Sequence, residues 1–153
     1  MKLSSSVLIF LISFFITFTA FSATPQFKDY PVTETFQGPN APVNLSDPGV
    51  REFRTRLKEA AKLKPNFAGH YILTYWGCGT GCIDPWIINA KTGKFVGVPF
   101  SVSTFPDDKG NPDDRLQFKL GSNLLIIQGH LNEAQEGGLH YFKLESEKLV
   151  PIP

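Results

Sequence analysis

Two cysteines four positions apart, Cys78 and Cys82, constrain this chain more than any other feature, because they are its only cysteines. In an extended strand their Cα atoms would lie far beyond the roughly 4.4–6.8 Å that a disulfide allows, so a bond requires the chain to turn back on itself. Gly77, Gly79 and Gly81 permit such a turn. A ring this small stabilises a protein by only about 2 kcal/mol, so we expect it to fix a local surface rather than the whole fold.

The first residues show the order of properties that is typical of a secretory signal peptide. Lys2 gives a short positive region, and residues 7–21 follow without any charge. Ala20 and Ser22 then supply the small residues of a signal peptidase site. We therefore expect cleavage after Ser22, with cleavage after Ala23 as the alternative, and export to the periplasm or the medium. An uncleaved membrane anchor is disfavoured, because the apolar stretch is shorter than the roughly 20 residues of a span.

Removal of residues 1–22 would leave residues 23–153 as a single exported domain of ordinary size. The whole chain has 15 basic and 14 acidic residues, so loss of Lys2 leaves 14 of each sign. Such a balance gives no net field to attract nucleic acid. We expect no nucleic-acid partner and, after cleavage, no membrane span. An oxidising compartment outside the cytoplasm favours a disulfide between the two cysteines.

One amphipathic helix is predicted to begin at Pro48 and to end before Pro65. Polar residues just before Pro48 can cap the first free amides, and proline suits the first helical position. An apolar stripe at helical spacing is formed by Val50, Phe53 and Leu57. The opposite face is mostly basic, which favours a solvated surface over a contact with anionic lipid or envelope polymer.

The rest of the chain consists of short apolar stretches separated by turns, a pattern that indicates antiparallel strands. Six strands are predicted, at residues 67–76, 86–89, 96–102, 115–120, 124–128 and 139–144. A turn at residues 89–93 should place Gly93 at positive φ, and residues 30–36 form a further strand-like stretch. We predict an α+β fold, in which an N-terminal amphipathic helix packs on an antiparallel β-meander of about six strands, either open or curled toward a barrel.

Three motifs follow one another along the chain: NFAGHY at residues 66–71, WGCGTGC at residues 76–82 and AKTG at residues 90–93. With the helix that precedes them, they resemble a group of small exported bacterial proteins of uncharacterised function. The resemblance covers about half of the mature chain. It implies export and a disulfide, and it implies no activity, cofactor or catalytic residue.

The glycine-rich ring and its flanks form the leading candidate for a binding site. Backbone amides beside glycines can form a nest for a hydrogen-bond acceptor, and the flanking tryptophans offer stacking surfaces. The predicted binding residues are Trp76, Thr80, Asp84 and Trp86. A rigid connector between strands is the simpler structural role. A redox site is disfavoured because the spacing is not Cys-x-x-Cys, and a zinc site would need two further ligands.

Two alternatives place chemistry elsewhere. His70 with Asp84 could form a general-base pair, although no G-x-S-x-G elbow accompanies it and a disulfide leaves no thiol nucleophile. The last hairpin loop carries possible metal ligands at His130, Glu133, Glu136 and His140. Pairing Ile127 with Phe142 suits the apolar faces of that hairpin and turns the two histidines away from each other. We therefore predict no metal site and no cofactor.

These observations favour a non-enzymatic binding or inhibitory module of the cell envelope, whose partner is an envelope protein or a polar ligand. The alternative is a small exported hydrolase that uses His70 with an acidic partner. The two hypotheses differ in one geometric feature, because the hydrolase requires an acid within hydrogen-bond reach of His70 in a cleft.

Overall fold

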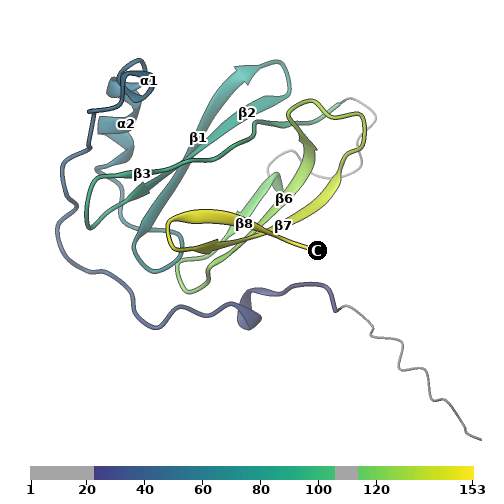
Figure 1. Ribbon diagram of the computed structural model, residues 1–153, viewed down its shortest axis with the longest axis horizontal. Coiled ribbons are helices and arrows are strands. Elements are labelled where there is room, and N and C mark those ends of the chain that lie inside the picture. Colours follow the sequence, from purple (N-terminus) through teal and green to yellow (C-terminus); the bar gives the residue numbers. More distant parts are fainter. Residues whose placement is uncertain (1–22, 106–113) are drawn as a thin grey trace, which may run out of the picture.

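The computed structural model describes residues 23–105 and 114–153 (Figure 1). The predicted signal peptide lies outside these ranges. The helical segments are η1 (Phe27–Asp29), α1 (Pro48–Arg51) and α2 (Arg54–Ala60). The strands are β1 (Tyr71–Gly79), β2 (Cys82–Asn89), β3 (Phe95–Val96), β4 (Val102–Ser103), β5 (Leu116–Phe118), β6 (Leu124–Leu131), β7 (Gly138–Glu145) and β8 (Lys148–Ile152). Within the described residues no helix is long and apolar enough to cross a membrane.

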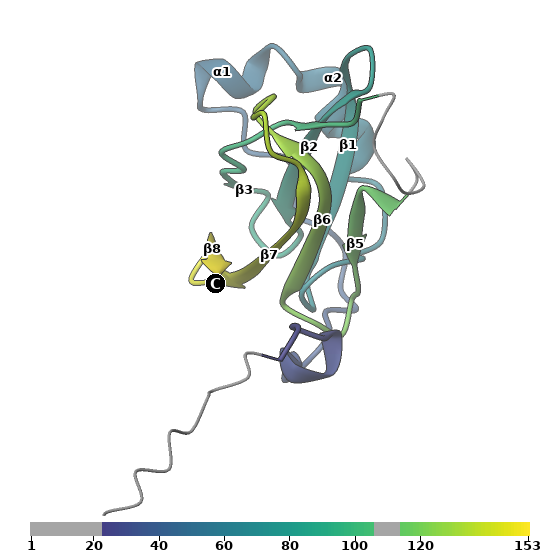
Figure 2. The same ribbon diagram turned by 90° about the vertical axis from the view of Figure 1, so that its right-hand side faces the viewer.

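The strands form one antiparallel sheet that does not close into a barrel. The strand order is β1-β2-β4-β6-β7-β8, with β3 also paired to β2 and β5 also paired to β6. Strands β6 and β7 bend strongly across the rest of the sheet (Figure 2), but β1 and β8 remain at the two ends of the order. The predicted antiparallel, β-rich fold is confirmed in outline. The barrel alternative is wrong, and the described part of the chain has eight strands rather than about six.

The predicted single helix is instead two short helices, α1 and α2, with a turn at Phe53 between them. Its start is as expected, since the Asp47 side chain accepts a hydrogen bond from the Gly49 amide at 2.8 Å. The helix breaks because Phe53 adopts φ −98° and ψ 10° while its ring packs on Trp76. The helix is also not N-terminal in the domain, because a long extended segment that begins at Ala23 precedes it.

That extended segment does not contain the predicted strand at residues 30–36. One isolated bridge pairs Pro31 with Ser122, and Pro31 has no amide hydrogen with which to continue a ladder. The Phe36 amide then donates a hydrogen bond to the Gly69 carbonyl oxygen at 2.8 Å. The segment therefore lies against the turns at the edge of the sheet instead of joining it.

Other boundaries differ from the prediction where the chain turns tightly. Residues 67–70 form a turn before β1 rather than its first part, and residues 97–101, around Pro99, separate β3 from β4. Strand β8 was not predicted, because its turn with β7 places Ser146 and Glu147 at φ 49° and 58° and contains no glycine. Positive φ at two successive residues is the geometry that asparagine and glycine usually signal in a sequence.

Two apolar cores lie on opposite faces of the β1–β2 hairpin, because successive side chains of a strand point to opposite faces. Leu73 and Ile87 belong to the larger core, which also contains side chains from β6 and β7. Ile72 and Ile88 belong to the smaller core beneath α1 and α2. The hairpin is therefore packed on both faces along most of its length, and its two ends are where side chains reach the surface.

Candidate functional site

The β1–β2 hairpin carries all the residues of the predicted site. Its register pairs Tyr71 with Asn89 at one end and Gly79 with Cys82 at the other. The predicted disulfide is confirmed, with 5.2 Å between the Cα atoms of Cys78 and Cys82. We call residues 76–82 the ring end of the hairpin. We call residues 66–71, together with the turn at residues 89–93, the histidine end.

The ring is held from one side and open on the other. The Gly81 carbonyl oxygen accepts hydrogen bonds from the Thr104 amide at 2.9 Å and from Arg115 Nη1 at 3.1 Å. Cys78, Gly79 and Thr80 are exposed. The disulfide and the bonds to Gly81 together present these three residues as a fixed protrusion.

The two tryptophans beside the ring are half-buried packing residues rather than free stacking surfaces. The Trp76 and Trp86 rings stack with their centroids 5.0 Å apart, and Phe53 lies 5.3 Å and 5.0 Å from them. The Arg56 guanidinium lies 5.4 Å above Trp76. Asp84 accepts a hydrogen bond from Trp86 Nε1 at 3.0 Å. Of the four predicted binding residues, only Thr80 is fully at the surface, and the other three hold the helical turn on the hairpin.

The outer edge of β1 changes character along its length. The Asn66 side chain covers it at Leu73, donating to the carbonyl oxygen at 3.0 Å and accepting from the amide at 2.8 Å. Alternate residues of an antiparallel strand point their backbone groups the same way, so those of Tyr75 and Gly77 also point outward. No partner for these groups exists among residues 23–105 and 114–153, and Tyr75 is 51% exposed. The edge of β1 is therefore open at Tyr75 and Gly77, next to the ring, and covered at Leu73, farther from it.

The sheet's other terminal strand, β8, is protected from pairing by its composition. Pro151 has no amide hydrogen to offer, and Lys148 places a charge on the strand. Strand β1 has neither device between Leu73 and the ring. The sequence alone shows which residues β1 and β8 contain, but only the strand order shows that both strands lie at the ends of the sheet.

At the histidine end, His70 and Lys91 line one cavity of about 210 Å³. The Ala90 amide donates to the His70 carbonyl oxygen at 2.9 Å, which places Lys91 beside the histidine. Lys91 Nζ lies 3.2 Å from Oε1 of Glu34, which comes from the extended N-terminal segment. Burial lowers the pKa of His70, and the positive charge of Lys91 lowers it further, against smaller opposite effects of Glu147 and Glu34. Both effects favour the neutral imidazole of His70.

The predicted catalytic pair of His70 and Asp84 is not formed. Asp84 lies opposite Trp76, six residues along β1 from His70, which corresponds to roughly 20 Å of strand. Asp84 instead serves Trp86, and the His70 ring has no hydrogen-bond partner in the described part of the chain. The carboxylates that influence His70 are Glu34 and Glu147, neither of which was predicted. The hydrolase hypothesis therefore loses the acid on which it was built.

The possible metal ligands of the last hairpin do not converge. Strand β6 pairs Leu125 with Phe142 and Ile127 with His140, two residues away from the predicted register. A shift of two residues preserves the faces, so His130 and His140 still point to opposite sides of the sheet. His130 Nδ1 donates to the Ala134 carbonyl oxygen at 2.8 Å, and His140 Nε2 donates to that of Gly129 at 3.1 Å. The described residues contain no group of three metal-ligating side chains.

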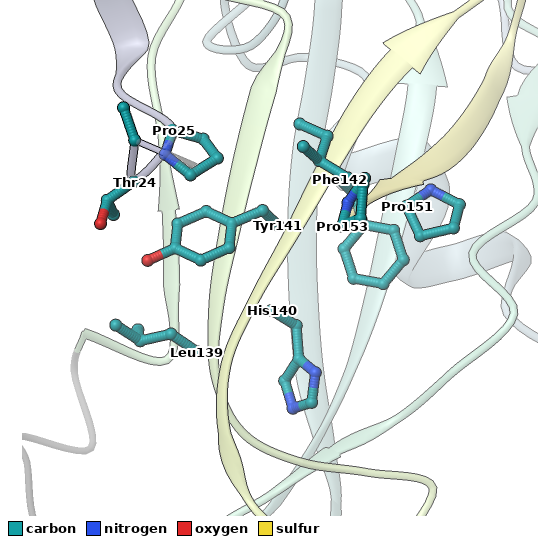
Figure 3. A pocket seen from close by; sticks show the side chains of 10 residues that line it. Thr24, Pro25, Leu139, His140, Tyr141, Phe142, Pro151 and Pro153 are labelled. Atoms are coloured by element: carbon teal, nitrogen blue, oxygen red, sulfur yellow. The ribbon is translucent and has the colours of Figure 1, made fainter. Parts of the chain in front are cut away.

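A larger depression of about 390 Å³ lies where β7 and β8 meet the start of the domain (Figure 3). Its walls are mainly apolar and rich in proline: Pro25, Leu139, Phe142, Pro151, Ile152 and Pro153. The histidine of this depression, His140, is bonded through Nε2 to the Gly129 carbonyl oxygen. This depression offers shape but no convergent polar side chains.

Comparisons with models of protein families, with curated proteins and with solved structures find no match for this chain. The motif resemblance therefore stays a prediction, and the features that bear on function are the geometries of the two hairpin ends.

Proposed function

We propose that the mature domain is a non-enzymatic binding or inhibitory module of the cell envelope, and that it recognises an envelope protein through the ring end of the β1–β2 hairpin. The observation that carries the proposal is the open edge of β1 at Tyr75 and Gly77, directly beside the exposed ring. Unpaired strand edges bind extended segments of other chains by strand addition. A fixed edge loses little conformational entropy on binding.

Several features at the ring end support this mode of binding. The disulfide and the bonds to Gly81 hold the tip of the hairpin in place, and the tryptophan cluster holds it against α2. Tyr75 offers a large, half-exposed aromatic side chain beside the open edge. Tyrosine is enriched among residues that dominate binding energy at protein interfaces. Thr80 adds a hydroxyl group at the tip.

The experiment begins with capture of the partner from envelope extract and continues with the purified pair. Strand addition predicts that the amides of Tyr75 and Gly77 become protected from hydrogen exchange in the complex. Tyr75→Pro removes the outward amide without removing a β1–β2 hydrogen bond, and we expect it to lower the affinity by about tenfold or more. Tyr75→Ala keeps that amide and should retain the protection. Binding with unprotected amides at both positions would show that the edge is not the site.

We also propose that the chain is exported and that its mature form begins at Ala23. The closed disulfide supports this, because such bonds persist in oxidising compartments. N-terminal sequencing of the protein from the periplasm and the medium tests the proposal. Recovery of the full-length chain in the membrane fraction would contradict it.

A further inference from the structure

The cavity at the histidine end is built by four segments that lie far apart in the sequence. Residues 31–34 form one wall of the cavity. The other three segments contribute Ala68 and His70, Lys91, and Asn123. Backbone hydrogen bonds fix these segments to one another: the Val32 amide bonds to the Gly121 carbonyl oxygen at 3.1 Å, and the Asn123 amide to that of Tyr30 at 2.8 Å. The cavity is therefore preformed by the fold and does not depend on one loop.

The backbone on its inner side is strained. Ala68 has φ 44°, a left-handed conformation that is uncommon for residues other than glycine. Gly69 follows at φ 80°, where a Cβ atom would lie 2.5 Å from the Glu34 carbonyl oxygen. These two residues turn the chain so that His70 lines the cavity. Strain of this kind persists where the surrounding structure enforces it, and it is frequent at functional sites.

The polar groups of the cavity differ in how strongly they are already bound. Lys91 pairs with Glu34, but the pair reaches the surface, since the two side chains are 38% and 76% exposed. Such surface pairs contribute little free energy, so a ligand anion can replace Glu34. The His70 ring and the Asn123 side-chain amide have no hydrogen-bond partner in the described ranges. The cavity thus combines one ammonium group with two unused polar side chains.

We propose that this cavity binds a small organic monocarboxylate. Its oxygens would accept hydrogen bonds from Lys91 Nζ and a His70 ring N–H, while a short apolar tail contacts Pro31, Val32 and Ala68. The volume of about 210 Å³ is smaller than pockets for drug-sized ligands, which begin at about 300 Å³. A doubly charged anion fits poorly, because Glu34 and Glu147 already place two negative charges near His70.

This site is independent of the ring end and predicts its own pH dependence. The charged groups that act on His70 are Lys91, Glu147 and Glu34, and burial disfavours its charged form. A bound carboxylate stabilises the imidazolium, so binding raises the pKa of His70. By linkage, affinity for the carboxylate must increase as the pH falls from about 7.5 to about 5.5.

The experiment uses the disulfide-bonded mature protein and follows the His70 ring and backbone amides by NMR. N-acetylalanine is the probe, and the neutral N-acetylalaninamide and sulfate, which is doubly charged at both pH values, are its controls. We expect the acid to shift the His70 and Lys91 signals at millimolar concentration, and to bind more tightly at the lower pH. The amide and sulfate should leave these signals unchanged.

Two variants test the assigned roles. Lys91→Gln should weaken binding by about tenfold or more, since it removes a charge-assisted hydrogen bond. Lys94→Gln, which changes an exposed lysine of the same region outside the cavity, should have no effect. His70→Gln should remove the increase in affinity at low pH. Unshifted His70 signals at about 50 mM acid, equal binding of the amide, or unchanged affinity in Lys91→Gln would overturn the proposal.

Discussion

The two ends of the β1–β2 hairpin are held by different means. At the histidine end, Phe67 is completely buried and backbone hydrogen bonds join the end to the N-terminal segment and to Lys119 and Leu120. At the ring end, Cys78 and Thr80 are exposed beyond Trp76, and the disulfide and the hydrogen bonds to Gly81 hold this part of the chain. The comparison shows that a strand pair can be ordered beyond its core only when something other than burial holds it. The covalent bond leaves the surface of the tip available for binding.

The largest expected difference between the two ends comes from their glycines. Gly93, in the turn of the histidine end, has φ 69°, and an added Cβ would overlap the Pro42 carbonyl oxygen. Gly93→Ala should therefore destabilise the domain by about 4 kcal/mol or more. Gly77→Ala, at the ring end, meets only the Cys82 carbonyl oxygen at 4.0 Å and should change stability by about 0.5 kcal/mol or less. Urea unfolding of both variants measures the difference, and equal losses would contradict this comparison.

A smaller loss is expected from the aromatic cluster below the ring. Trp76→Ala removes the contacts with Phe53 and Trp86 and should cost about 3 kcal/mol, the lower limit for a tryptophan that is only partly buried. The matched control is Tyr75→Ala on the opposite face of β1, which should cost about 1 kcal/mol or less. Thermal or urea unfolding decides between these values. A stable Trp76→Ala variant that lost only partner binding would restore the tryptophan as a recognition residue.

Removal of the disulfide should have an intermediate and local effect. Replacing both Cys78 and Cys82 by serine is expected to cost about 2 kcal/mol and to leave the rest of the domain folded. Amides of the ring should then exchange faster, while those of Tyr71 and Ile72 at the histidine end keep their protection. Complete unfolding of the variant would mean that the ring contributes more than closure of a short loop.

The smallest effect concerns pH and the histidine end. The pKa of His70 is lower in the folded protein than its ordinary value of about 6.5. Below about pH 6.5 the unfolded chain therefore binds a proton at His70 more readily than the folded protein does. The folded state therefore loses stability as the pH falls through about 6.5, and the loss stops once His70 is protonated in both states. His70→Gln should lose less stability than the wild type between about pH 7.5 and about pH 5.5. Urea midpoints at the two pH values measure this, and identical losses would argue against it.

Local chemistry made several features predictable from the sequence. The cysteine and glycine spacing gave the ring, the polar residue before Pro48 gave the helix start, and the turn at Gly93 was found with its positive φ. Each of these depends on a few neighbouring residues. Features that depend on contacts between distant segments were missed, such as the break at Phe53, which is fixed by packing against the two tryptophans.

The histidine-end cavity was missed although part of its signal was present. Counting outward from the disulfide pairs Tyr71 with Asn89 and Trp76 with Asp84, which already separates His70 from Asp84 and brings it beside Lys91. Glu34 could not have been found in this way, because no sequence pattern indicates which turn the extended N-terminal segment will contact. The predicted register of the last hairpin was wrong by two residues. The register of a hairpin depends on its loop, and this loop contains Asn132 and Glu133 at positive φ.

Strand β4 has a consequence for the order in which the domain assembles. It is two residues long, yet it joins β2 to β6 through Val102 and Ser103, each of which pairs with residues about 20 to 30 positions away. The β1–β2 and β6–β7 hairpins need only short loops to close, and short loops form faster than long ones. We therefore expect the two hairpins to form early in folding and β4 to join them late. The rate of folding should then depend on substitutions at Val102 more than on the ring.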